Sequence, residues 1–404
     1  MTTKRHLPDY ADCTGCGACG AVCPTGSITM EYNQEGFVVP VVAASCVFCG
    51  KCTKVCPAIH KPEVENAVEQ AVYCAVHKDK AIWAQSSSGG AFTAICQVFG
   101  DEETVVFGAV YDKDARCVKH TWVKGIQNIG AFRGSKYVQS DMGNCLVALK
   151  GFLKEGKKVI FSGTPCQVAA VRNYLKLSSV DTDLLLCVDL ICHRVGSPGV
   201  FRDYIQNLEQ KQGAEIQEYS FRHKKISLGR HKLFVTRICY GDGNVSIDED
   251  NPYTNLFLQK VLCRESCGSC QFACEKRMGD LTIADCKDLF AIVPKAKANR
   301  NASTVVINTQ AGMAVFERLS ELMDIYPSDV ETLKKTNSPF ATPAKASERR
   351  SAFFADYKNH IYGSAEQCMS RYVKKPSVKQ RLLRAIPGKI KGRVKNIFNR
   401  TRKV

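Results

Sequence analysis

Two closely similar stretches near the N-terminus decide the architecture: CTGCGACGAVCP at residues 13–24 and CVFCGKCTKVCP at residues 46–57. Each follows the pattern C-x2-C-x2-C-x3-C-P, which is typical of bacterial proteins that bind two 4Fe–4S clusters. In that arrangement the first three cysteines of each stretch bind one cluster, and the fourth binds the other. The spacing therefore predicts one cluster on Cys13, Cys16, Cys19 and Cys56 and a second on Cys46, Cys49, Cys52 and Cys23.

Zinc and disulfides account for these cysteines less well. Structural zinc also takes paired cysteines and is the main alternative, but two quartets that each end in Cys-Pro fit zinc poorly. A disulfide framework is not expected, because the chain is long and residues 1–12 contain no apolar segment typical of a secretion signal. Residues 15–20 spell G-x-G-x-x-G, but no strand precedes them and cysteines interrupt them, so the context excludes a dinucleotide site.

The composition indicates a cytoplasmic metalloprotein of two or three domains. The chain has 404 residues, 45% of them hydrophobic, and 22 cysteines, which is far more than core packing needs. No apolar run in the sequence approaches the length needed to cross a bilayer. Many cysteines without an export signal indicate a reducing compartment and metal binding.

The net charge of +17 comes mostly from the C-terminal segment 374–404, which contains twelve Lys or Arg and no acid. Because the charge is concentrated there, no nucleic-acid partner is expected. Apolar residues recur in this segment near helical spacing, which favours a basic amphipathic helix at a membrane surface or in a partner groove. The alternative is a disordered, solvated tail, because Pro387 and Gly388 interrupt the helix. The sequence leaves both open.

The middle of the chain predicts a mixed α/β domain, because apolar strands alternate with helices as in a parallel sheet. Two strand–loop–helix units stand out, at 158–177 and 184–211, and in each a proline follows a predicted N-cap, Thr164 or Ser197. Ligands of such sheets bind beyond the carboxyl ends of the strands. Cys166 and Cys192 both lie there, so they are expected to face one another. Further strands are predicted at 72–76, 105–111, 280–285 and 303–308, antiparallel strands within 215–250, and a helix from 310 to about 323.

Six short motifs in this part of the chain occur in the order of one known family. They are SSGGAFT at 87–93, GSKY at 134–137, GTPCQ at 163–167, DLICH at 189–193, CGSC at 267–270 and DLTIAD at 280–285. In these the chain resembles the beta subunit of the hydrogenases and dehydrogenases that reduce the deazaflavin coenzyme F420. Bacterial relatives carry a ferredoxin module in front, as here, and the resemblance covers residues 1 to about 345.

The resemblance implies FAD and a third 4Fe–4S cluster in the second domain. The loop before a helix at 88–93 suits a pyrophosphate, and Lys136, the catalytic candidate, would favour a reduced, anionic flavin. Carried over by position, the FAD contacts are Ser88, Gly89, Gly90, Thr93, Gly134, Ser135, Lys136 and Tyr137. The third cluster's ligands would be Cys166, Cys192, Cys267 and Cys270. Cys263 and Cys274 are alternative ligands but are more simply ordinary thiols. The cysteines predicted to lie in the core are Cys74, Cys96, Cys187 and Cys239.

Two departures from the family pattern border the presumed substrate side. Relatives usually have glycine where this chain has Arg194, and an aromatic pair where it has Cys286 and Lys287. The predicted clusters and flavin tolerate these changes, but the identity of the second substrate does not follow from the resemblance.

The sequence thus predicts an α+β protein: a two-cluster ferredoxin-like module at 1–62, a mixed α/β flavin-binding domain at 70–345, and a basic tail at 346–404. The expected function is that of an iron–sulfur flavoprotein oxidoreductase. Electrons would pass between a redox partner or small donor, the 4Fe–4S clusters, FAD and a deazaflavin-like or other organic acceptor. The alternative is an electron-relay subunit that hands electrons to a partner enzyme without substrate chemistry of its own.

Overall fold

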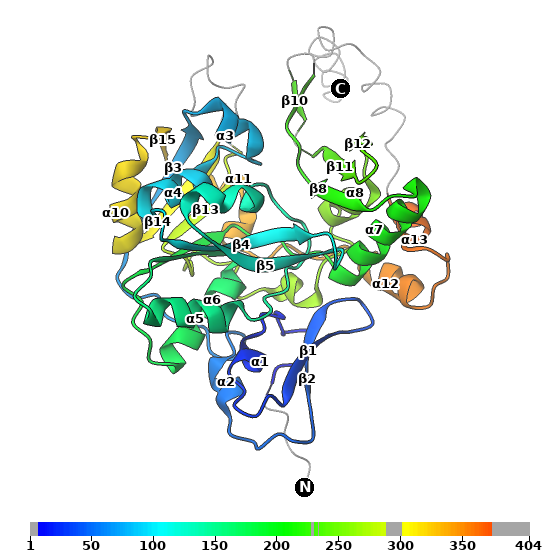
Figure 1. Cartoon of the computed structure of the whole chain (residues 1–404), viewed down its shortest axis with the longest axis horizontal. Coiled ribbons are helices and arrows are strands. Elements are labelled where there is room, and N and C mark those ends of the chain that lie inside the picture. The colour runs from blue at the N-terminus through cyan, green and yellow to red at the C-terminus, as the bar shows by residue number, and fades with distance from the viewer. Residues whose placement is uncertain (1–6, 228–229, 233, 288–300, 374–404) are drawn as a thin grey trace, which may run out of the picture.

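The computed structural model describes residues 7–227, 230–232, 234–287 and 301–373 (Figure 1). The expectation of a membrane-surface or partner helix falls on 374–404, outside the described residues, and stays a prediction. None of the helices in the described ranges is long and apolar enough to cross a membrane.

The N-terminal module is a small unit of two short helices and one hairpin. Helices α1 (Ala18–Ala21) and α2 (Lys51–Val55) each begin within a cysteine quartet, directly after a glycine with positive φ. Between the two cysteine stretches the chain forms a hairpin, in which β1 (Ile28–Tyr32) pairs antiparallel with β2 (Val38–Val42). Asn33 closes its turn, because its side-chain oxygen accepts hydrogen bonds from the backbone N–H groups of Glu35 and Phe37.

The second domain is built on an eight-stranded mixed sheet with the order β15-β3-β14-β13-β7-β6-β4-β5. The four strands β13, β7, β6 and β4 run parallel to one another, as the alternation of strands and helices predicts, while the strands towards both edges pair antiparallel. The bounds are β15 Met323–Ser328, β3 Ala67–His77, β14 Ser303–Thr309, β13 Leu281–Asp285, β7 Leu185–Leu190, β6 Val159–Gly163, β4 Val105–Asp112 and β5 Cys117–Lys124.

Helices cover both faces of this sheet because its central strands are apolar on both sides. Val106 packs towards α4 (Ala91–Phe99) and α10 (Gln310–Leu319). Its neighbours Val105 and Phe107 pack towards α5 (Cys145–Lys154) and α6 (Pro165–Leu177). The N-terminal module lies against this second helical layer (Figure 1), with Ala18 and Val55 in the same core cluster.

A third layer of packing lies beside the sheet, where α7 (Pro198–Gln212) meets a three-stranded antiparallel sheet of β12, β11 and β8. Helices α12 (Arg350–Lys358) and α13 (Ala365–Tyr372) fall within the segment that the sequence predicts to be tail. They pack against this layer instead, with Phe353 and Phe354 of α12 and Met369 of α13 buried in its core cluster. The remaining elements are α3 Lys80–Gln85, β8 Ile216–Ser220, β9 Lys225–Ser227, β10 Arg230–Lys232, β11 Thr236–Tyr240, β12 Val245–Asp248, α8 Pro252–Leu258 and α11 Val330–Thr336.

The N-terminal module is anchored to the second domain at two places. At one, the side-chain amide of Asn173 in α6 donates to the carbonyls of Val55 and His60 at 3.2 and 2.7 Å. At the other, the Gly199 N–H donates to the Gly36 carbonyl at 2.9 Å, and a Cβ on Gly36 would lie 2.6 Å from the Gly199 Cα. The two backbones can approach this closely only because both residues are glycine.

Candidate functional site

The first cysteine quartet gathers at the inner end of the N-terminal module. Its members are Cys13, Cys16, Cys19 and Cys56, and each is at most 9% exposed. Burial raises the pKa of Cys16 to about 11, and the proximity of Cys56 and Cys13 adds to this shift. Cys56 is 40 residues from Cys16 in the sequence, so α2 brings the fourth cysteine of one stretch beside the first three of the other. This is the arrangement that the spacing predicts for one cluster.

The second quartet lies at the outer end of the same module. Cys49 is exposed, Cys23, Cys46 and Cys52 are half-buried, and the intervening Val47 and Phe48 are 60% and 58% exposed. Burial raises the pKa of Cys23, but hydrogen bonds from Thr25 and nearby backbone N–H groups outweigh it, so the net pKa is lowered. A cluster on these cysteines would face solvent or a partner.

A third group of cysteines lines a cavity of about 400 Å³ between the N-terminal module and the second domain. Cys166 is the second residue of α6, directly after β6, and Cys192 lies two residues past the end of β7. Cys267 and Cys270 come from the 3-10 turn Glu265–Ser269 and the residue after it. All four predicted ligands of the third cluster line this cavity. In the described ranges, no three His, Cys, Asp or Glu converge tightly enough to hold a single metal ion.

Burial is the largest cause that raises the pKa values of these four thiols, and for Cys166, Cys192 and Cys267 the neighbouring cavity cysteines raise them further. For Cys267 the pKa is raised to about 12, and for Cys166 it lies well above its usual range. Thiols in this state are protonated at neutral pH, and only a positively charged metal would deprotonate them. Four converging sulfur donors around a cavity fit a 4Fe–4S cluster, which is held by four thiolates.

A buried ion pair holds the two halves of this site together. The Nη2 of Arg277 lies 3.3 Å from an Asp189 carboxylate oxygen, with both side chains fully buried, and also donates to the Leu190 carbonyl at 2.7 Å. Asp189 is in β7, just before Cys192, whereas Arg277 closes the loop that carries Cys267 and Cys270. The aspartate of the DLICH motif therefore acts as a structural anchor for the cysteines.

Asp280 plays a similar part for α6. Its carboxylate accepts from the Arg172 side chain at 3.1 Å, from the Cys187 N–H at 2.7 Å and from the Thr309 hydroxyl at 2.9 Å. Arg172 lies in α6, the helix that begins beside Cys166, so this contact ties the helix to the start of β13. The Thr164 N-cap fixes the same helix, since its N–H donates to the Gln167 side chain.

The cysteine cavity adjoins the first quartet directly. The Nε of Arg264 and the hydroxyl of Ser266 both donate to the carbonyl of Cys13, at 2.7 and 2.9 Å. Arg264 and Ser266 line the cavity, and the next residue is Cys267. Cys13 of the first quartet is therefore hydrogen-bonded to Arg264 and Ser266, and Ser266 directly precedes Cys267 of the third group.

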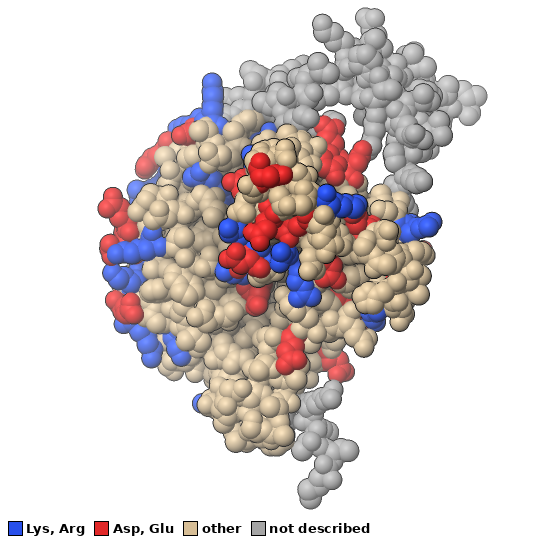
Figure 2. Space-filling model, turned by 45° about the vertical axis from the view of Figure 1, so that its right-hand side comes forward, with Lys and Arg blue, Asp and Glu red and all other residues tan. Residues whose placement is uncertain are grey.

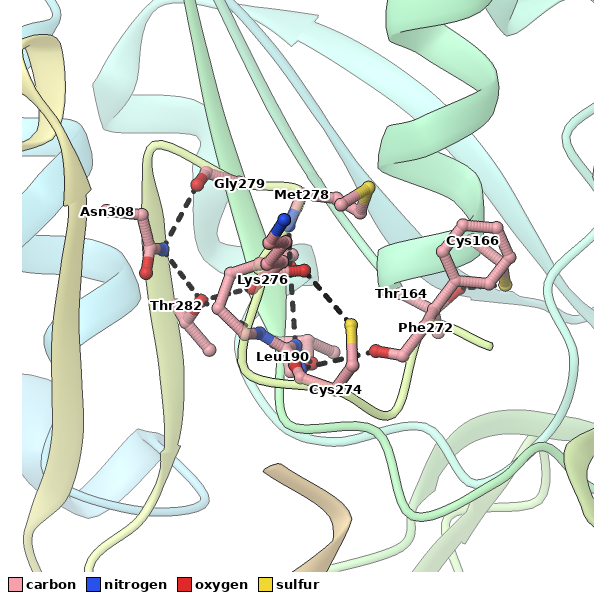
Figure 3. A network of polar contacts seen from close by, with 12 residues as sticks. Thr164, Cys166, Leu190, Phe272, Cys274, Lys276, Met278, Gly279, Thr282 and Asn308 are labelled. Atoms are coloured by element: carbon pink, nitrogen blue, oxygen red, sulfur yellow. Dashed lines mark hydrogen bonds and ion pairs between the residues drawn. The ribbon is translucent and has the colours of Figure 1, made fainter. Parts of the chain in front are cut away.

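The two alternative ligands lie apart from the cavity lining. Figure 3 shows the Cys274 sulfur directed at the Lys276 carbonyl, at 3.2 Å, with Cys166 beyond the ring of Phe272. The thiol of Cys263 donates to the Lys260 carbonyl. Of the predicted core cysteines, Cys74, Cys96 and Cys187 are buried. The prediction for Cys239 is wrong: it is half-buried in the three-stranded sheet, and its thiol donates to Glu218.

The two predicted FAD loops lie side by side at the start of α4. The Ser135 N–H donates to the Ser87 hydroxyl at 2.6 Å, and Arg133 Nε donates to Thr93 at 3.2 Å. Gly90 precedes α4 with φ +93°, and a Cβ on Gly89 would lie 2.2 Å from the Ala75 carbonyl oxygen. Gly89 is therefore required for packing against the sheet, whatever the loop binds.

Lys136 is half-buried beside these loops and lacks an acidic partner among the described residues. Its ammonium donates to the carbonyls of Ala131 and Arg133, and burial lowers its pKa to about 7. Tyr137 stacks on Phe257 with ring centroids 4.6 Å apart. The hydroxyl of Ser88 donates to the Ala302 carbonyl, and Gly134 has φ +84°.

Three basic residues near these sites were not predicted from the sequence. The Lys224 ammonium donates to the Ser88 carbonyl at 2.6 Å and lies 3.9 Å from the Trp83 ring centroid. Arg133 and Arg264 join segments that are distant in sequence. A single Lys or Arg carries no spacing pattern, so only the fold could identify them.

Two family models match the chain, one in the N-terminal module and one in the second domain. Residues 12–59 match the model of the 4Fe-4S dicluster domain, and residues 156–332 match that of the C terminus of the coenzyme F420 hydrogenase/dehydrogenase beta subunit. No curated protein matches. A chain in the xenon-derivatized F420-reducing NiFe hydrogenase complex from Methanosarcina barkeri is 18% identical, with a TM-score of 0.45 over 69% of this chain and 91% of that one. The chain thus contains a segment that matches a 4Fe–4S dicluster domain and, after it, a segment that matches the C terminus of an oxidoreductase beta subunit.

Proposed function

We propose that the protein is an iron–sulfur flavoprotein that carries electrons between its N-terminal clusters and FAD through a third 4Fe–4S cluster. The observation that carries this proposal is the cavity in which Cys166, Cys192, Cys267 and Cys270 converge from three separate segments. When bound, 4Fe–4S clusters supply one-electron transfer and FAD supplies two-electron chemistry. The working units would be the module at 1–62 and the domain at 70–345.

The chain's own contacts support an ordered route. The outer quartet is partly exposed, with Cys49 at the surface, and suits exchange with a redox partner, whereas the first quartet is buried at the module's inner end. Arg264 and Ser266 hold the Cys13 carbonyl against the cavity wall, so the inner cluster would lie next to the third one. The fixed contact keeps the two centres at a constant separation, which a sequential route requires.

FAD would bind at the paired loops before α4. The start of α4 offers backbone N–H groups to a phosphate, and Arg133, Lys136 and Lys224 provide positive charge around it. Lys136 supports this placement best, because burial disfavours its charged form and an anionic ligand would restore it. In this position Lys136 would stabilise negative charge on the reduced flavin. A deazaflavin-like or other organic acceptor would receive the electrons.

The proposal is tested by iron and flavin analysis of anaerobically purified protein. Three clusters require about twelve iron atoms per chain, together with one FAD. The variant Cys192→Ala should lose about a third of the iron and keep FAD, because none of the predicted FAD contacts lines the cysteine cavity. Electrons supplied at the N-terminal module should then no longer reduce the flavin.

Cys263→Ala is the matched control, since Cys263 is a buried thiol four residues from Cys267 that does not line the cavity. It should keep all its iron. Full iron and full flavin reduction in Cys192→Ala would reject the third cluster. Bound iron without any flavin would favour a relay subunit that passes electrons to a partner enzyme.

A further inference from the structure

Two arginines at the cysteine cavity have polar groups that the described part of the chain leaves unsatisfied. Arg194 and Arg264 both line the cavity, and they are 8% and 1% exposed. Within the described residues, Nη1 of Arg194 and Nη2 of Arg264 are buried and make no hydrogen bond. The other nitrogens of Arg264 are used, since Nε donates to Cys13 and Nη1 to Val38 and Gln139.

Such atoms indicate an acceptor that belongs in the cavity. A buried, charged N–H donor without a partner is costly, so native structures seldom retain one unless a ligand completes it. Among the described residues that line the cavity, Asp12 is the one carboxylate, and it forms no ion pair with either arginine. The protein therefore offers two cationic donors to whatever group the four cysteines hold.

We propose that Arg194 and Arg264 donate these N–H groups to the sulfur atoms of the third cluster and raise its reduction potential. This inference rests on the third cluster proposed above. A cluster with four thiolate ligands is anionic, and adding an electron makes it more so. Neighbouring positive charge and hydrogen bonds to sulfur therefore stabilise the reduced form more than the oxidised one. A bound third cluster would accept one electron from a reduced N-terminal cluster, with no bond formed or broken, and the two arginines would stabilise the added negative charge.

The two arginines lie on neighbouring segments, because the Arg264 N–H donates to the Val195 carbonyl at 3.1 Å. Arg194 follows Cys192 by two residues, and Arg264 precedes Cys267 by three. Arg264 also binds the Cys13 carbonyl, so replacing it would disturb the contact between the clusters. Arg194 donates through Nε to the neighbouring His193 carbonyl, which makes it the cleaner residue to change. Both are positioning residues that tune a centre held by other side chains.

The test is a redox titration of the holoprotein followed by electron paramagnetic resonance. The third cluster's signal is the one absent from Cys192→Ala. In Arg194→Met its midpoint potential should fall, so that the equilibrium constant for accepting an electron from the N-terminal clusters drops about tenfold, which corresponds to about 59 mV for one electron. The potentials of the N-terminal clusters and the iron content should stay unchanged.

Lys61→Met is the matched control. Lys61 is also a cation near this wall, but its ammonium donates to the Gln271 carbonyl and the Cys274 sulfur, at 3.0 and 2.9 Å. It should shift the potential much less than Arg194→Met. Equal shifts in the two variants, or no shift in Arg194→Met, would overturn the proposal while the third cluster stands. Absence of the third signal from the unmodified protein would instead reject the proposed function. If Arg194→Met loses iron, Arg194→Lys decides: it should keep the iron and show a smaller fall in potential, and an unchanged potential would overturn the proposal.

Discussion

The outer quartet of the N-terminal module and the cysteine cavity of the second domain use the same donor atoms in opposite settings. Cys49 is exposed and follows the exposed apolar residues Val47 and Phe48, and Figure 2 shows few charged groups on the face of the N-terminal module that it draws. Cys166, Cys192, Cys267 and Cys270 lie instead around a cavity between two parts of the fold. In the proposed function this difference would separate two tasks, contact with a partner at the surface and electron transfer inside the protein.

The two sites also differ in what holds them. The outer quartet comes from residues 23–52, and α2 with its preceding loop supplies three of the four thiols. The cavity cysteines come from two strand ends and one loop, and they depend on the Asp189–Arg277 pair and on Asp280. The cavity should therefore be sensitive to changes in the core of the second domain, and the outer quartet should not.

The largest effect is expected from Arg277→Met, which removes one partner of the buried pair. The Asp189 carboxylate would then be buried without its counter-charge, which typically costs about 3–5 kcal/mol. Urea unfolding followed by circular dichroism measures the loss, and iron analysis should show the third cluster lost and the other two kept. Arg237→Met is the control, because the exposed Arg237–Glu218 pair is worth about 1 kcal/mol or less. Equal losses in both variants would contradict the anchoring role.

A second contrast is expected in thiol reactivity after the metal is removed. The thiolate is the reactive form, and burial raises the pKa of Cys267 from 9.0 to about 12. Below about pH 9 the thiolate fraction of Cys267 is about a thousandfold lower than that of a thiol with the ordinary pKa, and it rises tenfold for each added pH unit. Alkylation followed by mass spectrometry should therefore label exposed Cys49 early and Cys267 last.

The order of labelling has a clear failing outcome. If Cys267 reacts as fast as Cys49 at neutral pH, the cavity opens in the metal-free protein. The difference in burial between the two sites would then exist only while the clusters are bound. Labelling of Cys263, which is buried outside the cavity lining, shows whether the whole domain has opened.

Local spacing in the sequence predicts the 4Fe–4S dicluster domain, which the family model at residues 12–59 supports. The C-x2-C-x2-C-x3-C-P stretches predict both N-terminal quartets, because their loops are local, and the N-caps Thr164 and Ser197 mark two helices correctly. The parallel centre of the sheet follows from alternating strands and helices. Its antiparallel edges do not, because β3 and β15 pair across more than 240 residues and no local pattern encodes that register.

The surroundings of the cavity were beyond sequence reasoning for the same reason. Cys166 and Cys192 could be placed at strand ends, but Arg264 reaches Cys13 across 251 residues, and its role depends on how the module docks. Helices α12 and α13 fall in the predicted tail because the family resemblance ends near residue 345. Their buried faces, with Phe353 and Met369, become apparent only once α7 and α8 are placed beside them.

The smallest effect is expected at Lys136, where the measurement follows only the protonation of one side chain. Burial lowers the pKa of its ammonium to about 7, so without a ligand it should lose its proton as the pH rises through 7, about three units below an ordinary lysine. Only the neutral amine reacts with acylating reagents, so competitive labelling at a series of pH values should show Lys136 reacting with a midpoint near pH 7. Bound FAD should move this midpoint upwards, because an anion stabilises the protonated form. A midpoint near pH 10 without FAD would mean that Lys136 keeps its charge unaided. An unchanged midpoint on adding FAD would remove Lys136 from the flavin site and leave the cysteine cavity unaffected.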